Sequence, residues 1–150
     1  MNVLIDTNLL LRFVQPAHPM QPVAEAAMDA LRLGGDVPCI VPQVLCEFWV
    51  VSTRPVKDNG RGLTPAVVDA ELTTILTRFP LFDDTTAVFP EWRSLVVTHA
   101  VSGKPAHDAR LVAAMRVHGL THLLTFNVAD FTRFPVTVLD PASVAAPPTP

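Results

Sequence analysis

Four acidic residues stand inside or directly beside apolar segments of the chain: Asp6, Glu47, Asp108 and Asp130. Asp6 and Asp130 each follow an apolar run, whereas Glu47 and Asp108 share helical stripes with apolar residues. A buried carboxylate without a partner is costly, and few cationic residues lie nearby in the sequence. Carboxylate oxygens are ligands that Mg²⁺ and Mn²⁺ prefer. The four acids are therefore interpreted as a divalent-metal site.

Metal-assisted hydrolysis of a phosphodiester is the chemistry that such a site supports best. A divalent ion activates water and neutralises charge on the transferring phosphorus. The common nucleotide-binding sites are not indicated, because the chain has neither a G-x-x-x-x-G-K-[ST] nor a G-x-G-x-x-G motif. A phosphohydrolase with Asp6 as its nucleophile is also disfavoured, since such enzymes carry D-x-D and the second position here is Asn8.

The composition describes one ordinary domain with few surface charges. The chain has 150 residues, of which 49% are hydrophobic and only 17% are charged, and its net charge is -3. So few charges predict that apolar surface meets another subunit or a partner. The net charge provides no general attraction to nucleic acid. The compact basic stretch of Arg54, Lys57 and Arg61 is interpreted as a solvated loop, with a phosphate contact as the alternative.

The cysteines and tryptophans are expected to have structural roles rather than catalytic or binding roles. Cys39 and Cys46 lie among apolar residues and are predicted to be buried thiols in a reducing compartment. Trp49 and Trp92 are expected in the core or at an interface. The chain has no run of 18 apolar residues and no basic region before its first apolar run. We therefore expect a cytoplasmic protein without membrane contact.

Hydrophobic periodicity and turn residues predict short strands that alternate with helices. Strands are expected at residues 2–5, 37–41, 81–82, 122–126 and 136–139. Helices are expected around residues 9–14, at 23–33, around Glu47, at 64–79, at 90–99 and from Asp108 to Gly119. Residues 1–144 should thus form a single α/β domain, and the Pro-rich tail 145–150 is expected to be disordered.

Alternating strands and helices imply a parallel sheet that is covered by helices on both faces. In such folds, ligands bind beyond the carboxyl ends of the strands. Asp6 and Asp130 follow expected strands, and Glu47 lies on a helix that follows one. The expected positions of these acids therefore agree with the ligand-binding edge of the fold.

Four segments of the chain form one ordered set: residues 3–8 (VLIDTN), Glu47 within an apolar helix, residues 107–111 (HDARL) and residues 124–131 (LTFNVADF). Together they resemble PIN-domain ribonucleases of the VapC toxin kind. The resemblance implies a three-layer α/β PIN-like fold, with strand order 3-2-1-4-5 and helices on both faces of the sheet. It also implies a Mg²⁺-dependent endoribonuclease, with Mn²⁺ as a substitute, that acts on RNA, is blocked by a cognate antitoxin protein and forms a homodimer.

The resemblance also assigns roles to the acidic residues. Asp6, Glu47 and Asp108 match the three acidic positions that are best defined in the family. Family members place a fourth acid at the position of either Asn127 or Asp130. Because Asn127 is neutral, Asp130 is expected to coordinate the metal or water, and Asn127 to give polar support.

Three further positions qualify the resemblance. Thr7 and Asn8 are expected to support a ligand carboxylate by hydrogen bonds, with turn capping as the alternative. The position of Phe126 often holds a basic residue in the family, so this chain departs from the pattern there. A catalytically inactive RNA-binding or scaffold protein with the same PIN fold is the alternative function.

Overall fold

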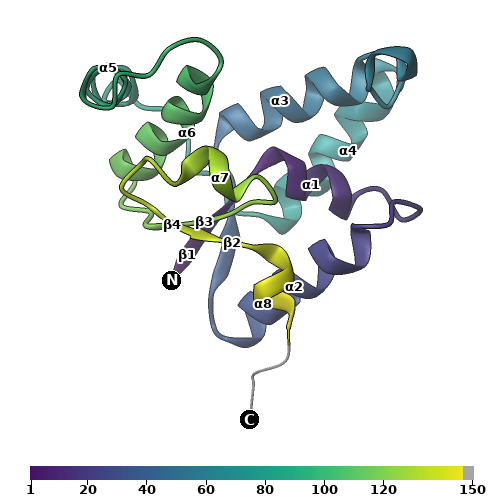
Figure 1. Cartoon of the computed structure of the whole chain (residues 1–150). Coiled ribbons are helices and arrows are strands. Elements are labelled where there is room, and N and C mark those ends of the chain that lie inside the picture. The colour runs from purple at the N-terminus through teal and green to yellow at the C-terminus, as the bar shows by residue number, and fades with distance from the viewer. Residues whose placement is uncertain (147–150) are drawn as a thin grey trace.

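A computed structural model describes residues 1–146 of the chain (Figure 1). Within this range the fold is built around a parallel sheet of four strands in the order β2-β1-β3-β4. β1 (Asn2–Ile5) lies between β2 (Val37–Cys39) and β3 (His122–Leu124), and β4 (Thr137–Leu139) lies at one edge. The predicted α/β class with a parallel sheet is thus confirmed.

The register of the two inner strands determines which residues leave the sheet together. Ile5 of β1 pairs with Leu124 of β3. Beyond this pair, Asp6 N donates a hydrogen bond of 3.0 Å to Leu124 O. Asp6 and Thr125 therefore follow neighbouring strands at the same carboxyl edge, which is where parallel sheets present ligand-binding residues.

The predicted third strand is reduced to a single parallel bridge between Ile40 and Leu81. Ile40 N donates to Pro80 O at 3.0 Å, and Phe82 N donates to Ile40 O at 2.9 Å. Pro80 has no N–H to extend the ladder, and the Asp-Asp-Thr sequence after Phe82 favours a turn. The bridge lies beyond β2, so it occupies the place of the third strand in the predicted order 3-2-1-4-5.

Eight α-helices and a short 3-10 turn accompany the sheet within residues 1–146. The helices are α1 (Thr7–Phe13), α2 (Gln21–Leu33), α3 (Pro42–Thr53), α4 (Pro65–Arg78), α5 (Val88–Thr98), α6 (Pro105–Val117), α7 (Val128–Phe131) and α8 (Pro141–Ala145), and the 3-10 turn is Val56–Asp58. α7 and α8 are not among the predicted helices. α8 includes Ala145, one residue past the predicted end of the domain, and the tail residues 147–150 lie outside the described residues.

Local sequence signals explain several helix ends. Pro42 and Pro65 occupy the first turns of α3 and α4, where a missing N–H costs little. Thr64 caps α4 with its side chain. Gly35 and Gly119 follow α2 and α6 with φ angles of 85° and 67°, in the left-handed region that favours glycine.

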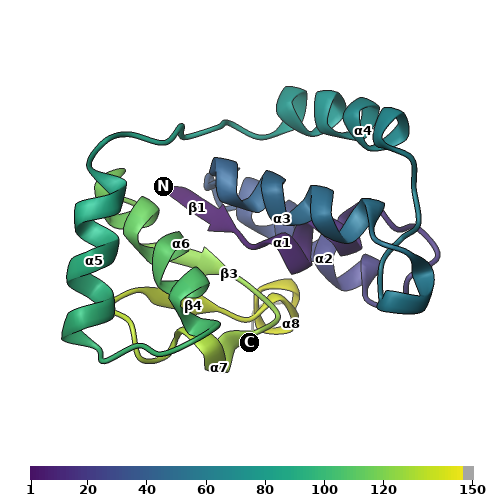
Figure 2. The ribbon, with the colours of Figure 1, turned by 90° about the horizontal axis from the view of Figure 1, so that it is seen from above.

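The helices form groups on the two sides of the sheet (Figures 1 and 2). α5 packs on α6 at one side of the molecule, whereas α3 packs against α1 and α4 at the other. The core between them is apolar and includes the fully buried Leu4, Met28, Met115 and Leu123. None of the helices within residues 1–146 has the length and hydropathy that crossing a membrane requires.

Candidate active site

Asp6 lies at the carboxyl end of β1, where it caps the N-terminus of α1. Its Oδ1 accepts a hydrogen bond from Thr7 N at 2.7 Å, and its Oδ2 accepts from Thr125 Oγ1 at 2.7 Å and from Asn8 Nδ2 at 3.1 Å. Burial raises the pKa of Asp6, hydrogen bonds from Thr125 and Thr7 oppose this rise, and two nearby carboxylates add to it. The Asp6 carboxylate is therefore held in one orientation despite the cost of its charge.

Glu47 lies on α3 and is only partly buried. Its Oε2 accepts a hydrogen bond of 2.7 Å from Thr7 Oγ1, and its Oε1 accepts one of 2.9 Å from Gln43 Nε2. Gln43 stands one helical turn before Glu47, and Thr7 belongs to α1. Both oxygens of the Glu47 carboxylate are thus fixed by neutral donors, and their charge stays uncompensated.

Asp108 lies in the first turn of α6, and burial raises its pKa to about 6. The charges of Asp130, Asp6 and Glu47 act in the same direction, and only His107 acts against them. No hydrogen bond from the described part of the chain contributes to this pKa. The Asp108 carboxylate is therefore free to accept a ligand, and it lies close enough to the other acids to be affected by their charges.

Asn127 and Asp130 are placed differently by the short α7 segment. Asn127 precedes α7 and lines the same cavity as Asp6, Glu47 and Asp108. Asp130 is exposed and does not line this cavity, although its charge raises the pKa of both Asp6 and Asp108. Asp130 is therefore near the site, while Asn127 reaches it directly.

These side chains meet in an open cavity of about 440 Å³. The cavity is lined by Asp6, Thr7, Asn8, Leu11, Cys46, Glu47, Val50, Val51, Asp108, Asn127 and Phe131. Its residues come from α1, α3, α6 and the α7 segment, which Figure 1 shows gathered above the strands. Three of the four predicted acids and all three predicted supporting residues thus line one cavity.

The acids of the site lack a cationic partner among the described residues. The ion pairs found within residues 1–146 involve other carboxylates, and none of them includes Asp6, Glu47, Asp108 or Asp130. Burial raises the pKa of Asp6 and of Asp108, and the neighbouring carboxylates raise both further, so a bound cation would relieve this repulsion.

The donor set fits a hard, partly hydrated cation. Across residues 1–146, no group of three or more His, Cys, Asp or Glu side chains is arranged to hold a metal ion by itself. Mg²⁺ commonly binds to only one or two carboxylates, together with waters and substrate phosphate. The free carboxylate of Asp108 and the oriented carboxylates of Asp6 and Glu47 suit this mode of binding.

Thr125 is a supporting residue that the sequence reasoning missed. It is fully buried, donates to Asp6 Oδ2, and its hydroxyl accepts from Asn8 Nδ2 at 3.1 Å and from Asn127 N at 3.0 Å. It therefore links Asp6 to the segment that carries Asn127. The available signal was its place near the carboxyl end of the strand expected at residues 122–126, which the implied strand order puts beside the first strand.

Gln43 is the second supporting residue that was missed. Its Nε2 donates to Glu47 and also to His107 O at 2.8 Å, and its Oε1 accepts from Arg110 Nη1 at 3.1 Å. Gln43 thus connects the Glu47 carboxylate to α6, the helix of Asp108. The available signal was the spacing of four residues between Gln43 and Glu47, which places both on one face of a helix.

The prediction that Cys46 is buried was wrong. Cys46 is exposed and lines the cavity, whereas Cys39 is buried and its pKa is raised to about 12 by desolvation. α3 is apolar on most of its sides, so its apolar residues do not reveal which side faces the core. Val44 is fully buried, but Val50 is 56% exposed and lines the cavity with Cys46.

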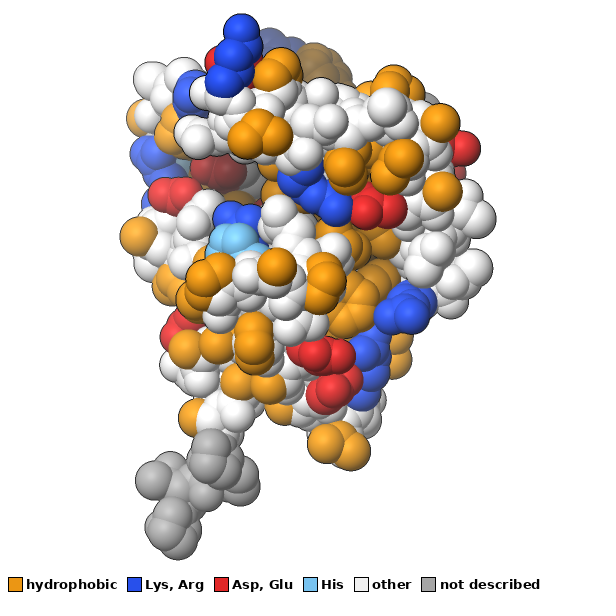
Figure 3. All heavy atoms as spheres, turned by 90° about the vertical axis from the view of Figure 1, so that its right-hand side faces the viewer, with side chains coloured by type: hydrophobic (Ala, Val, Ile, Leu, Met, Phe, Trp, Pro, Cys, Tyr) orange, Lys and Arg blue, Asp and Glu red, His pale blue; other side chains and the backbone are white. Residues whose placement is uncertain are grey.

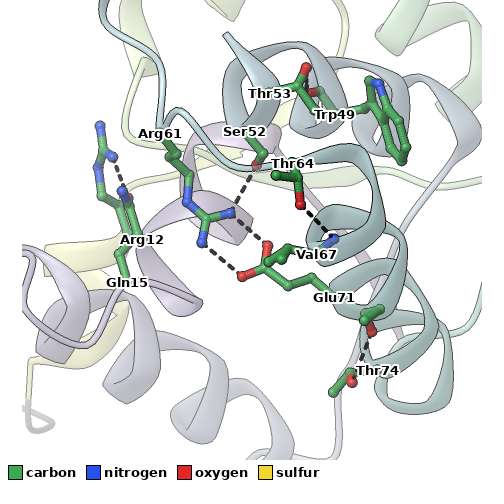
Figure 4. Close-up of polar contacts among 11 residues, drawn as sticks. Arg12, Gln15, Trp49, Ser52, Thr53, Arg61, Thr64, Val67, Glu71 and Thr74 are labelled. Carbon is green, nitrogen blue, oxygen red and sulfur yellow. Dashed lines mark hydrogen bonds and ion pairs between the residues drawn. The ribbon is translucent and has the colours of Figure 1, made fainter. Parts of the chain in front are cut away.

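The basic stretch after α3 is partly structural. Arg61 makes a bidentate ion pair with Glu71 at 2.7 and 2.8 Å and donates to Ser52 Oγ at 2.9 Å (Figure 4). Its guanidinium also lies over the ring of Phe48, 5.6 Å from the ring centroid. Lys57, a second basic residue of this stretch, is exposed. Arg61 is therefore neither a solvated loop residue nor free for a phosphate, because its charge holds α3 against α4.

Comparisons with known proteins agree with this fold. The PIN domain family model matches residues 3–136, while curated protein sequences give no match. The chain is similar to the VapBC2 structure from Rickettsia felis bound to a promoter DNA fragment, at 16% identity and a TM-score of 0.69, over 93% of this chain and 98% of that one. It is also similar to DNA-bound VapBC from Salmonella typhimurium, at 18% identity and a TM-score of 0.69, over 94% of this chain and 98% of that one.

A third similar structure is VapC20 of Mycobacterium tuberculosis, a sarcin-ricin loop cleaving toxin, at 20% identity and a TM-score of 0.57, over 81% of this chain and 86% of that one. At these identities the three likenesses concern the fold. The family match covers most of the chain, from within β1, the strand before Asp6, to residue 136, directly before β4. The chain therefore belongs to the PIN domain family.

Proposed function

We propose that this chain is a metal-dependent endoribonuclease that hydrolyses RNA phosphodiester bonds and acts as the toxin of a toxin–antitoxin pair. The observation that carries the proposal is the convergence of Asp6, Glu47 and Asp108 on one open cavity, with no cationic partner within residues 1–146. Membership of the PIN domain family supports it. The fold likeness to VapC20, a toxin that cleaves the sarcin-ricin loop, supports RNA as the substrate.

Mg²⁺ is the proposed cofactor, with Mn²⁺ as a substitute, and one or two of the carboxylates of Asp6, Glu47 and Asp108 would hold it together with water and substrate phosphate. Bound there, the ion would activate water and neutralise charge at the scissile phosphate. Asp130 adds negative charge near the site, and Asn127 offers an amide at the cavity wall. Because Asp130 is outside the cavity lining, we assign it a weaker contribution than the other three acids.

The neutral residues around the carboxylates have a positioning role. Thr125 and the Thr7 N–H fix Asp6, while the Thr7 hydroxyl and Gln43 fix Glu47. Orienting a carboxylate in advance avoids the loss of freedom that ordering it during the reaction would cost. The site therefore holds two acids rigidly and leaves Asp108 able to adjust.

An antitoxin is the proposed protein partner. A fold neighbour from Klebsiella pneumoniae is a toxin–antitoxin complex. This chain has a hollow of about 270 Å³ between α1, α2 and α4, which includes the apolar Phe13, Val14 and Ile75 together with charged residues. Figure 3 faces this side of the molecule and shows apolar side chains in a hollow that is bordered by charged groups. The homodimer stays a prediction.

Induced expression in a bacterial host tests the proposed function. The wild-type chain should arrest growth and generate new RNA 5′ ends, which sequencing of those ends will locate. Asp6→Asn should do neither, whereas Asp58→Asn, which removes an exposed acid of the 3-10 turn, should behave like the wild type. Identical RNA ends in cells that express the wild type and Asp6→Asn would overturn the proposal.

A further inference from the structure

A second cavity, of about 460 Å³, lies between α5 and α6. Its lining includes Asp84, Val88, Phe89, Trp92, His107 and Arg110. This volume is within the range of small-ligand sites and is sufficient for one nucleoside. The catalytic cavity and this one border on neighbouring residues of α6, because Asp108 lines the first and His107 lines the second.

One wall of the second cavity is aromatic. The rings of Phe89 and Trp92 are 5.8 Å apart between centroids and inclined by 32°. Trp92 Nε1 donates a hydrogen bond of 2.8 Å to Ala106 O, which fixes the orientation of the indole ring. Phe89 is 64% exposed, so much of its ring is available to a ligand. The wall offers a flat surface with little conformational freedom, which suits stacking of another aromatic ring.

The rim of this cavity carries one positive and one negative group. Arg110 Nη2 donates to Asp84 Oδ2 at 3.1 Å, and both side chains remain more than a third exposed. The guanidinium can donate to a ring nitrogen or carbonyl oxygen, and the carboxylate can accept from an exocyclic amino group. A neutral ring with donors and acceptors at its edge can therefore satisfy both groups at once.

Arg110 also joins the second cavity to the catalytic carboxylates. Its Nη1 donates to Gln43 Oε1, while Gln43 Nε2 donates to both Glu47 and His107 O. Arg110 itself is thus two hydrogen bonds away from Glu47. These hydrogen bonds form one continuous polar network across α3 and α6, and the network connects the two cavities.

We propose that the cavity between α5 and α6 binds an unpaired nucleobase of the RNA substrate, next to the phosphodiester held at the catalytic acids. The inference rests on the proposed ribonuclease function and adds a site that would select the nucleotide beside the cut. Proteins recognise single-stranded RNA by stacking bases on aromatic rings and by hydrogen bonds to base edges. A free phosphate suits this cavity less well, because Asp84 lies at its rim, and an apolar side chain would offer no further hydrogen bond to the ion pair of Arg110 and Asp84.

RNA binding without cleavage is the first test. All proteins carry Asp6→Asn and are assayed in EDTA by fluorescence anisotropy with a short single-stranded RNA of mixed sequence. Phe89→Ala should weaken binding by about 5- to 150-fold, which is the range for loss of one stacked base, and Phe89→Tyr should bind like the parent. Val97→Ala is the matched control, because Val97 is 73% exposed on the same helix and does not line the cavity.

Equal RNA affinity of the Phe89→Ala and Val97→Ala proteins overturns the proposal. The proposal is also overturned if Phe89→Ala leaves RNA affinity unchanged but alters the sedimentation of the protein, since the cavity would then serve contact between copies of the chain. Thermal melts accompany both measurements. Phe89→Ala should melt like its parent, because the side chain is mostly exposed.

Tryptophan fluorescence is the second test, and it distinguishes base from phosphate. In a Trp49→Phe background, Trp92 is the remaining tryptophan. Nucleoside 5′-monophosphates should quench its emission, and ribose 5-phosphate should not. Equal quenching by ribose 5-phosphate would overturn the assignment of a base.

The outcomes also separate this inference from the proposed function. Binding that depends on Phe89, in a protein that cleaves no RNA under any metal condition, would support the base site and reject the nuclease. Metal-dependent cleavage with unchanged affinity and unchanged cut positions in Phe89→Ala would reject the base site and keep the nuclease.

Discussion

Thr7 donates a hydrogen bond of 2.7 Å from its hydroxyl to Glu47 Oε2, although 40 residues separate the two in sequence. The N–H of the same residue donates to Asp6 Oδ1, also at 2.7 Å. One buried threonine thus orients two of the site's acids, one directly after β1 and one on α3. Its role goes beyond capping a turn.

Replacing the Thr7 hydroxyl should therefore impair cleavage more than folding. Thr7→Val keeps the volume and the N–H donor to Asp6 but leaves Glu47 Oε2 without its donor. We expect the cleavage rate to fall by about 10- to 100-fold, the usual cost of losing a partner of a metal ligand. The free energy of unfolding should change by only about 1 kcal/mol. Thr7→Ser retains the hydroxyl and should cleave RNA nearly as well as wild type. Equal rates for Thr7→Val and Thr7→Ser would contradict this role.

Asp108 should make the metal-free protein less stable as the pH rises. Its folded pKa is about 6, against 3.8 for an unperturbed aspartic acid side chain, as in the unfolded chain. Below both values the carboxyl is protonated in either state and has no effect. Between them the unfolded chain loses the proton first, so stability falls with rising pH and then levels off above the folded pKa.

Asp108→Asn removes this penalty. In EDTA near pH 7.5 the variant should be more stable than wild type by about 1–2 kcal/mol, which discounts the full effect for solvent screening of a partly exposed group. Near pH 4 the two proteins should have similar stability. Urea unfolding at both pH values provides the measurement, with the exposed Asp58→Asn as control. A variant that is less stable than wild type near pH 7.5 would show that Asp108 is a structural cap.

The two cysteines should react very differently with thiol reagents. Cys46 is exposed in the catalytic cavity, whereas Cys39 is buried and its pKa is raised to about 12. One thiol should therefore react in the native protein and both in denaturant, as mass spectrometry can count. Short RNA bound to the Asp6→Asn protein should slow the labelling of Cys46. An unchanged rate of Cys46 labelling at saturating RNA would indicate that the RNA binds outside the catalytic cavity.

Arg61 should matter for stability rather than for RNA binding. Arg61→Met breaks the bidentate pair with Glu71 and the bond to Ser52 (Figure 4), so the free energy of unfolding should fall by about 1–3 kcal/mol. RNA affinity of the folded variant should equal that of Lys57→Met, a control at an exposed neighbouring cation. Weaker RNA binding with unchanged stability would instead indicate that Arg61 contacts a phosphate.

Positions of acids relative to strands could be predicted from sequence, because they depend only on local patterns. Asp6 directly follows an apolar strand, and a parallel sheet places such residues at its ligand-binding edge. The supporting bonds of Thr125 and Gln43 depend on register and on how α3 and α6 approach each other. The pattern of residue types along the chain does not determine the strand register or the packing of α3 against α6.

The sequence-based predictions were wrong or incomplete where a segment was too short to show a helical period, or where the same apolar pattern suited both a core-facing and a cavity-facing helix. The apolar residues of α3 do not show which of them face the core and which face the cavity. Cys46 was therefore predicted to be buried in the core, whereas it lines the cavity. α7 has only four residues, too few to show a helical period. The start of α8 did carry a signal, since Asp140 caps it and Pro141 is its first residue.

The most direct test of the account is cleavage of single-stranded RNA by the purified protein at increasing Mg²⁺ concentrations. Wild type and Asp58→Asn should cleave at the same sites with the same dependence on Mg²⁺, and excess EDTA should abolish both activities. Glu47→Gln, which keeps the shape of the side chain and removes its charge, should show no cleavage while remaining folded. Cleavage that persists in EDTA, or a Glu47→Gln protein as active as wild type, would contradict the claim that these acids form a metal-dependent ribonuclease site.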